Sequence, residues 1–234
     1  MRNRGPWTTL EYDGWPGVSV GQTSALTGRA TDVFSTLDPL GLAHFLPGRS
    51  LHLPEQVHDS TVRYVRSPYD TCYPGADGLL SGRPDELLMI RTADCVPVVL
   101  LGDLTGEVGL VHAGWRGLVK GIFPCALEKM HGPVHVFLGA HIRSGRYEVG
   151  DDVVDRLEQC FDASEEELMN KGILSPGRHL SLNRALVEQG KQSGEVYSFQ
   201  GFPQDTSGDN PPMFSHRKNR TEERMLTWAV RRSR

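Results

Sequence analysis

Two histidines and one cysteine, distant along the chain, offer the nitrogen and sulfur ligands of a transition-metal site. His58 lies 37 residues before Cys95, and His112 lies 17 residues after Cys95. Imidazole and thiolate ligands together suit zinc or copper better than magnesium or calcium. Three protein ligands leave one coordination position for water or substrate, as in a catalytic zinc site. The spacing matches no local metal-binding motif, so the hypothesis of a metal site depends on the residue types.

The same residues support a metal-free alternative. Cys95 would be a nucleophile with His112 as its base, as in cysteine hydrolases and amidases. Such an enzyme does not need a second histidine on the sulfur, so the role of His58 distinguishes the two hypotheses. A lone histidine such as His112 could also be a hydrogen-bonded residue of the core.

Short apolar runs predict the strands that must position the cysteine and the second histidine. Residues 87–90, 96–101 and 108–112 form such runs and favour paired strands. Cys95 therefore precedes a strand and His112 ends one, and residues at strand ends can face a cleft. Ala113-Gly114 follows His112, where glycine permits a sharp turn or the close approach of a ligand.

Helical patterns alternate irregularly with these strands. Apolar residues four apart predict a helix over 118–130, ended by Gly132-Pro133. Further elements are expected as a strand at 134–138, helices at 153–161, after Ser164 and after Ser181, a loop at 203–212, and a helix or strand at 220–230. Strands and helices mixed in this way favour an α+β fold. We expect a single domain over 1–234, in which the first 50 residues form only short strands and turns.

The composition is that of an ordinary soluble protein. Of 234 residues, 38% are hydrophobic and 23% charged, and the net charge of −4 gives no general attraction to nucleic acid or membrane. No apolar run is long enough for a transmembrane span or a signal peptide, so a cytoplasmic location is expected. The four cysteines form no CxxC pair, which argues against disulfides. Besides Cys95, the cysteines are expected to be structural: Cys72, Cys125 and Cys160.

Several segments resemble one known family. The strings Thr92–Val98 and Val111–Leu118, with Ala76–Leu79 upstream, are similar to the laccase-domain family, first named multicopper polyphenol oxidoreductases. Its members are mostly described as zinc-dependent purine nucleoside phosphorylases with adenosine deaminase activity, and bacterial relatives are also called peptidoglycan editing factors. The resemblance continues at residues 56–58, 146–150 and 214–217, so it spans roughly residues 50–220.

The resemblance implies a fold, a cofactor and a substrate class. It implies helices outside two mixed β-sheets and places the family's metal ligands on His58, Cys95 and His112. Zinc is the implied ion. Copper is less favoured, because a multicopper centre needs paired histidine motifs that the nine histidines do not provide. The implied partners are a purine nucleoside and phosphate, with phosphorolysis of adenosine or inosine or deamination of adenosine as the reaction, and binding of a cell-wall precursor is the non-enzymatic alternative.

Charged residues near the motifs suggest further roles. Arg116 and Arg217 are candidates for phosphate binding, because a guanidinium fits phosphate bidentately. His216 is a candidate for hydrogen bonding to the substrate or the leaving group. Asp94 would orient a ligand histidine or bind a substrate hydroxyl, with capping of a turn as an equal alternative.

Other residues in the motifs carry weaker hypotheses. Gln56 is expected to orient the loop around His58 and to contribute to substrate binding. Trp115 is expected to pack in the core rather than to stack on a purine. The segment 139–147 departs from the family pattern, since it carries His141, Arg143 and Arg146 where many members have cysteines. We expect these two arginines to be structural or surface residues.

Overall fold

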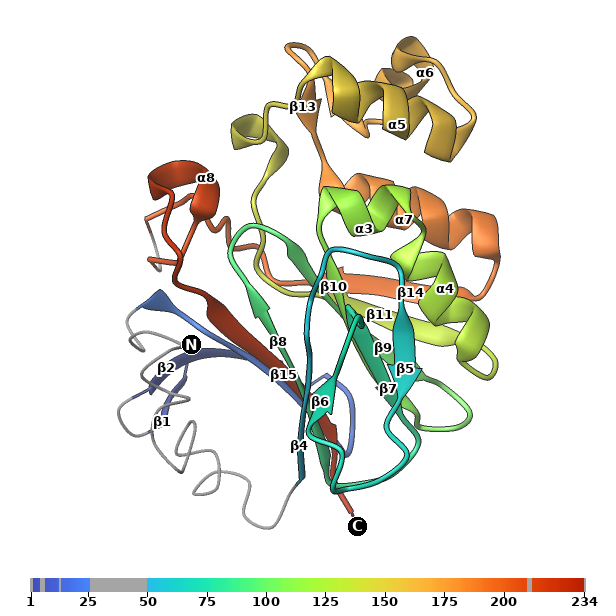
Figure 1. Ribbon diagram of the computed structural model, residues 1–234, viewed down its shortest axis with the longest axis vertical. Coiled ribbons are helices and arrows are strands. Elements are labelled where there is room, and N and C mark those ends of the chain that lie inside the picture. The colour runs from blue at the N-terminus through green and yellow to red at the C-terminus, as the bar shows by residue number, and fades with distance from the viewer. Residues whose placement is uncertain (1, 5–6, 13, 26–49, 210–211, 234) are drawn as a thin grey trace.

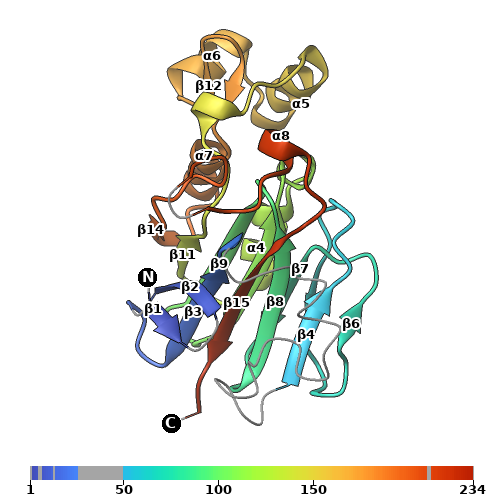
Figure 2. The ribbon, with the colours of Figure 1, turned by 90° about the vertical axis from the view of Figure 1, so that its left-hand side faces the viewer.

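Two mixed β-sheets lie face to face, and helices cover the outer face of one of them (Figures 1 and 2). The structure is a computed structural model, and it describes residues 2–4, 7–12, 14–25, 50–209 and 212–233. This arrangement confirms the predicted α+β fold with helices outside two mixed sheets. Of the N-terminal region for which only short strands and turns are predicted, residues 26–49 lie outside the described residues.

The first sheet has seven strands in the order β1-β2-β3-β15-β8-β4-β6. Its strands are β1 (Arg2–Arg4), β2 (Trp7–Tyr12), β3 (Val18–Thr23), β4 (Ser50–Pro54), β6 (Cys72–Tyr73), β8 (Glu86–Thr92) and β15 (Met225–Arg231). Strand β15 pairs antiparallel with both β3 and β8, so the C-terminal segment lies in the middle of the sheet. The prediction for 220–230 is thus resolved as a strand.

The second sheet has six strands in the order β14-β11-β9-β10-β7-β5. Its strands are β5 (Val62–Tyr64), β7 (Gly78–Ser81), β9 (Val96–Gly102), β10 (Val108–Ala113), β11 (Val134–Leu138) and β14 (Val196–Gly201). The predicted strands at 96–101, 108–112 and 134–138 are confirmed here, and the predicted strand at 87–90 is confirmed as β8. A small hairpin, β12 (Leu174–Ser175) with β13 (His179–Leu180), lies apart from both sheets.

Helices cover the six-stranded sheet and extend beyond its edge (Figure 1). They are α3 (Trp115–Val119), α4 (Ile122–Lys129), α5 (Asp151–Phe161), α6 (Glu165–Asn170), α7 (Leu182–Ser193) and α8 (His216–Asn219), with a 3-10 turn η2 (Ser144–Arg146). Ser164 caps α6 in a capping box with Glu167, as predicted. Ser181 precedes α7, but its hydroxyl donates to Asn183 instead of capping the helix backbone.

The helix predicted over 118–130 is two helices. Gly121 has φ of 82° between α3 and α4, a left-handed conformation that interrupts the helical path. The apolar stripe was still a correct guide to the buried face, since Leu118, Ile122 and Ala126 are fully buried. Helix α3 begins one residue after β10, with Gly114 as the residue between them.

Alternation along the strands builds two cores. In β9, Val98 and Leu100 face the helices, whereas Val99 faces the other sheet. Strand β10 repeats this pattern, because Val111 lies in the helix-side core and Leu110 in the core between the sheets. No described helix has both the length and the apolar composition needed to cross a bilayer.

Candidate active site

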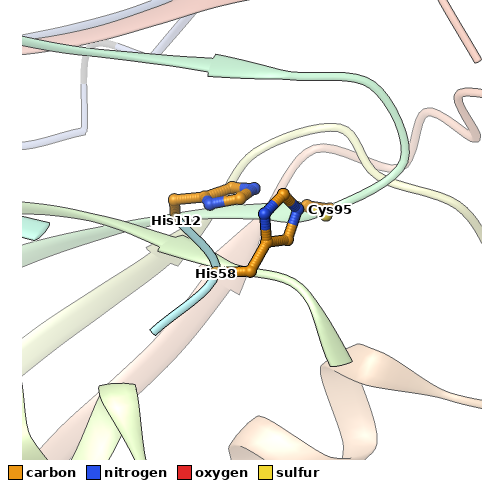
Figure 3. Close-up of side chains that lie close together, drawn as sticks. All are labelled: His58, Cys95 and His112. Atoms are coloured by element: carbon orange, nitrogen blue, oxygen red, sulfur yellow. The ribbon is translucent and has the colours of Figure 1, made fainter. Parts of the chain in front are cut away.

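His58, Cys95 and His112 come together although they belong to three separate segments (Figure 3). One ligand atom from each of them lies within 4.8 Å of the others, and the rings of His58 and His112 have centroids 4.8 Å apart. Among the described residues, this is the one such group of three or more histidine, cysteine or acidic side chains. The structure therefore brings together the three residues predicted as ligands.

Strand register explains why the cysteine meets the second histidine. In the antiparallel pair of β9 and β10, His112 lies opposite Pro97 and Ala113 lies opposite Val96. Cys95 immediately precedes β9, so it lies beside the residues at the end of β10. Gly114 leaves the space for this contact, because a Cβ atom there would lie 2.7 Å from Cys95 Sγ.

Asp77, a residue with no role predicted from the sequence, fixes the positions of His58 and His112. Its fully buried carboxylate accepts hydrogen bonds from the backbone N–H groups of Val57, His58 and Asp59 at 2.9–3.0 Å. The same carboxylate lies 2.9 Å from Nδ1 of His112. A carboxylate on the second nitrogen of a ligand histidine fixes its ring orientation and tautomer. Asp77 thus holds the His58 loop and aims Nε2 of His112 at Cys95.

The loops of the cluster store backbone strain. His58 and Gln56 have φ of 61° and 67°, and Asp94, beside the cysteine, has φ of 86°. Non-glycine residues in this region each cost on the order of 1–3 kcal/mol and persist where surrounding bonds fix them. Here Asp77 fixes the backbone at His58, and the side chain of Gln56 pairs with the backbone N–H and carbonyl of Arg91 at 2.9 and 2.7 Å.

Mutual charge interactions shift the protonation of the cluster. Burial opposes ionisation of Cys95, but His112 and His58 outweigh it and lower the pKa of the Cys95 thiol to about 6. Burial also opposes protonation of His112, yet the Cys95 thiolate and the Asp77 carboxylate raise the pKa of His112 to about 9. A thiolate beside imidazole groups is the form in which cysteine binds metals or acts as a nucleophile. The donor set, its orientation by Asp77 and the space at Gly114 all fit one zinc-like ion.

A cavity of about 920 Å³ opens above the cluster. Its lining contains every residue that the sequence singled out as a site candidate: Gln56, His58, Asp94, Cys95, His112, Arg116, His216 and Arg217. Arg143 and Arg146 are not part of this lining. The guanidinium of Arg143 instead donates to the carbonyl of Phe202 and contacts His141, as expected for a structural residue.

Two site candidates, Asp94 and Gln56, form hydrogen bonds to the backbone of neighbouring segments. The Asp94 carboxylate does not touch a ligand histidine, because it accepts from the Thr206 hydroxyl at 2.7 Å and the Arg217 backbone N–H at 2.6 Å. It thereby anchors α8 at the cavity wall, which is closer to the capping alternative. The oxygen of the Gln56 amide accepts from the Arg91 backbone N–H and its nitrogen donates to the Arg91 carbonyl, so Gln56 ties the loop of His58 to β8.

Arginines dominate the charge of the cavity. Besides Arg116 and Arg217, the lining holds three arginines for which no role was predicted, and two carboxylates: Arg91, Arg220, Arg224, Asp94 and Glu222. Arg116 stacks on the Trp115 ring with its Cζ 4.5 Å from the centroid, and Arg217 stacks on Tyr147 at 4.9 Å. Trp115 packs partly against the helix-side core, as predicted, and also faces the cavity. Such a wall favours an anionic ligand.

The remaining cysteines lie outside this site. All four cysteines are free thiols, in agreement with the expectation from their spacing. Cys125 and Cys160 lie on α4 and α5, and Cys72 is exposed on β6.

Comparison with known proteins identifies the family. The family model described as "Multi-copper polyphenol oxidoreductase laccase" matches residues 30–232. A purine nucleoside phosphorylase of Mycobacterium bovis is 33% identical over 202 residues, which are 81% of this chain and 76% of the relative. The purine nucleoside phosphorylase YlmD of Geobacillus stearothermophilus is 32% identical over 199 residues, covering 76% of this chain and 71% of YlmD.

A solved structure shows the same fold. The Bacillus licheniformis protein YfiH superimposes with a TM-score of 0.80 at 20% identity, over 97% of this chain and 99% of YfiH. Together with the family match over most of the chain, this confirms the resemblance noted in the sequence motifs. The chain belongs to the family described as multi-copper polyphenol oxidoreductase laccases.

Proposed function

We propose that this protein is a zinc-dependent purine nucleoside phosphorylase that cleaves adenosine or inosine with phosphate. The observation that carries the proposal is the convergence of His58, Cys95 and His112 on the floor of an arginine-lined cavity. The names of the two relatives support the substrate class. A single three-ligand group among the described residues supports one ion and not a multicopper centre.

Different residues of the cavity have different roles in the proposed phosphorolysis. A phosphate oxygen bonds to C1′ of the ribose, the C1′–N9 bond breaks, and the purine leaves with the electron pair and takes up a proton. Arg116 and Arg217 bind and orient the phosphate, since their stacked guanidinium groups keep their N–H edges free. His216 lines the same cavity and is our candidate for hydrogen bonding to the departing purine.

His58, Cys95 and His112 would hold the zinc ion, and the chemistry that it would supply there is that of a Lewis acid. Asp77 keeps His112 in the orientation for binding, and Gly114 keeps the space beside Cys95 clear. Asp94 acts indirectly, by holding the backbone of Arg217 and therefore the arginine that meets phosphate.

The test is identification of the products. Zinc-loaded protein is incubated with inosine or adenosine, with and without phosphate, and the products are separated by chromatography. We expect free hypoxanthine or adenine and ribose 1-phosphate only when phosphate is present. Inosine formed from adenosine without phosphate would reveal deamination, and absence of both products from either nucleoside would contradict the proposal.

A second candidate function is hydrolysis by a Cys95 nucleophile without a metal ion. Cys95, His112 and Asp77 form a row of thiol, imidazole and carboxylate, the order of groups in a cysteine hydrolase. In that case activity would survive chelators and the variant His58→Ala. In the phosphorylase, His58→Ala removes a ligand and lowers both zinc content and turnover by at least about 100-fold.

A further inference from the structure

Tyr147 is a rigidly held wall residue of the cavity to which neither the sequence nor the proposed reaction assigns a role. It follows η2, and its side chain is buried in the helix-side core with 8% exposed. Its N–H donates to the carbonyl of Ser144, and its carbonyl accepts from the N–H of Leu180, both at 2.9 Å. The ring thus has a fixed position between η2 and β13.

The hydroxyl of Tyr147 has no hydrogen-bond partner within the described portion of the chain. Tyr147 lines the cavity, and the charges of Cys95, Arg217, Asp94 and Arg116 all act on its hydroxyl. Burial raises the pKa of this phenol, so the group remains a neutral donor at physiological pH. The hydroxyl is not one of the fully buried polar atoms without a partner, so it is accessible from the cavity, where a bound ligand can accept its hydrogen bond.

Arg217 lies against the same ring and supplies a second donor group. Its Cζ is 4.9 Å from the Tyr147 centroid, and its backbone N–H is held by Asp94 at 2.6 Å. Stacking occupies the face of a guanidinium and leaves its edge free for two hydrogen bonds. Arg116 on Trp115 shows the same stacking without a hydroxyl in the pair. Arg217 and Tyr147 therefore place a guanidinium and a phenol hydroxyl on the same wall of the cavity.

We propose that Tyr147 and Arg217 act as a joint clamp for the phosphate co-substrate, with the Tyr147 hydroxyl donating to a phosphate oxygen. This inference rests on the proposed phosphorolysis and assigns the anion to one wall of the cavity. The clamp predicts that the two side chains depend on each other in phosphate binding and have little effect on the nucleoside.

The variant Tyr147→Phe tests the clamp while keeping the ring and its stack with Arg217. Initial rates with saturating inosine and varied phosphate should give a KM for phosphate that is roughly 10- to 100-fold higher, as expected for loss of a hydrogen bond to a charged group. The KM for inosine should stay within about twofold. The matched control is Tyr64→Phe, because the Tyr64 hydroxyl donates to Glu107 away from the cavity.

A double-mutant comparison of Tyr147 and Arg217 distinguishes a joint clamp from two independent phosphate contacts. Arg217→Ala should also raise the KM for phosphate, and Tyr147→Phe should have a much smaller further effect in that background. An unchanged KM for phosphate in Tyr147→Phe, or a change confined to inosine, would overturn the inference and leave the proposed function standing.

Calorimetric titration of the zinc-loaded protein with inorganic phosphate alone measures phosphate affinity without any reaction. Phosphate binding that weakens in Tyr147→Phe would support the clamp even if neither nucleoside is cleaved, in which case the proposed function fails and the anion site remains. Absence of phosphate binding by the unsubstituted protein would overturn the clamp.

Discussion

Two buried histidine–carboxylate pairs lie in different sheets, and only one of them opens on a cavity. In the seven-stranded sheet, His52 Nε2 lies 2.6 Å from Glu86, and Nδ1 is closed off by the Asp70 carbonyl at 2.6 Å and the Tyr73 hydroxyl at 2.9 Å. In the six-stranded sheet, His112 gives Nδ1 to Asp77. Nε2 of His112 has no such partner among the described residues and faces the space between Cys95 and His58.

A buried histidine paired with a carboxylate is therefore not by itself a sign of a metal or substrate site. His52 is fully buried and has both ring nitrogens occupied by protein groups, which makes it a brace between β4 and β8. His112 is almost as buried, with 4% exposed, but one nitrogen faces two further ligands. Substitutions in the two pairs should therefore have opposite consequences for metal binding and for stability.

The largest contrast is expected between His112→Ala and His52→Ala. Loss of His112 should reduce zinc from one ion per chain to near zero with a modest loss of stability, because Asp77 keeps three backbone donors. Loss of His52 should leave zinc unchanged but destabilise the fold by about 1–3 kcal/mol, since the Glu86 carboxylate loses a buried hydrogen-bond partner while it keeps its ion pair with Arg83. Elemental analysis and thermal unfolding measure the two effects. Unfolding of His112→Ala, or loss of zinc from His52→Ala, would break the comparison.

A methyl group at Gly114 should disturb the cluster of His58, Cys95 and His112 without removing a ligand. The new Cβ would lie 2.7 Å from Cys95 Sγ, so the sulfur must move. We expect Gly114→Ala to lower zinc affinity by about 100-fold, by analogy with the upper range for changes around a metal site. The control is Gly145→Ala, where no atom lies within 4 Å of an added Cβ. Equal zinc affinity of the two variants in a chelator competition assay would show that the space at Gly114 is not needed.

Replacing Asp77 or Glu86 by its amide compares the two histidine–carboxylate pairs with a smaller change in structure. Asp77→Asn should weaken zinc binding by about 10- to 100-fold, because an amide cannot accept at both ends from the loop and from His112. Glu86→Gln should lower the unfolding temperature and leave zinc affinity unchanged. If the zinc dissociation constant of Asp77→Asn equals that of Glu86→Gln, Asp77 has no role in orienting the ligand.

The smallest effect expected is a pH dependence in the metal-free protein. The pKa of Cys95 is lowered to about 6, so its thiolate is present above that pH and is lost as the pH falls through it. At pH 7 alkylation by iodoacetamide should be about threefold faster than for an ordinary thiol with a pKa near 8.5, because the larger thiolate fraction outweighs the lower nucleophilicity of a low-pKa thiolate. The rate should be half-maximal near pH 6, and Cys95→Ala should remove this phase. A half-maximal rate near pH 8.5 would show that the imidazoles do not stabilise the thiolate.

Much of the frame could be predicted from sequence because apolar runs determine strands. The runs at 96–101 and 108–112 placed Cys95 before one strand and His112 at the end of the next, which is where they lie. The ligand set could be proposed because few residue types bind zinc. Antiparallel register then brought the two residues together, a consequence of pairing that the motifs alone do not state.

The supporting residues could not be predicted, since their roles depend on contacts between distant segments. Asp77 lies within a matching string, but nothing local indicates that it binds the backbone at residues 57–59 and the ring of His112. For Asp94, orientation of a ligand histidine, binding of a substrate hydroxyl and capping of a turn remained alternatives in the sequence, and only the fold shows that its carboxylate bonds to Thr206 and to the backbone of α8. Tyr147 is brought to the cavity by a turn whose position depends on β13 and the core.

Titration of the metal-free protein with Co²⁺ tests the central claim most directly, because a thiolate ligand gives cobalt a charge-transfer absorption. We expect saturation at one ion per chain, with the thiolate band, displacement of cobalt by zinc, and loss of the band in Cys95→Ser. A titration without a thiolate band, or with the same band in Cys95→Ser, would contradict a metal site formed by His58, Cys95 and His112.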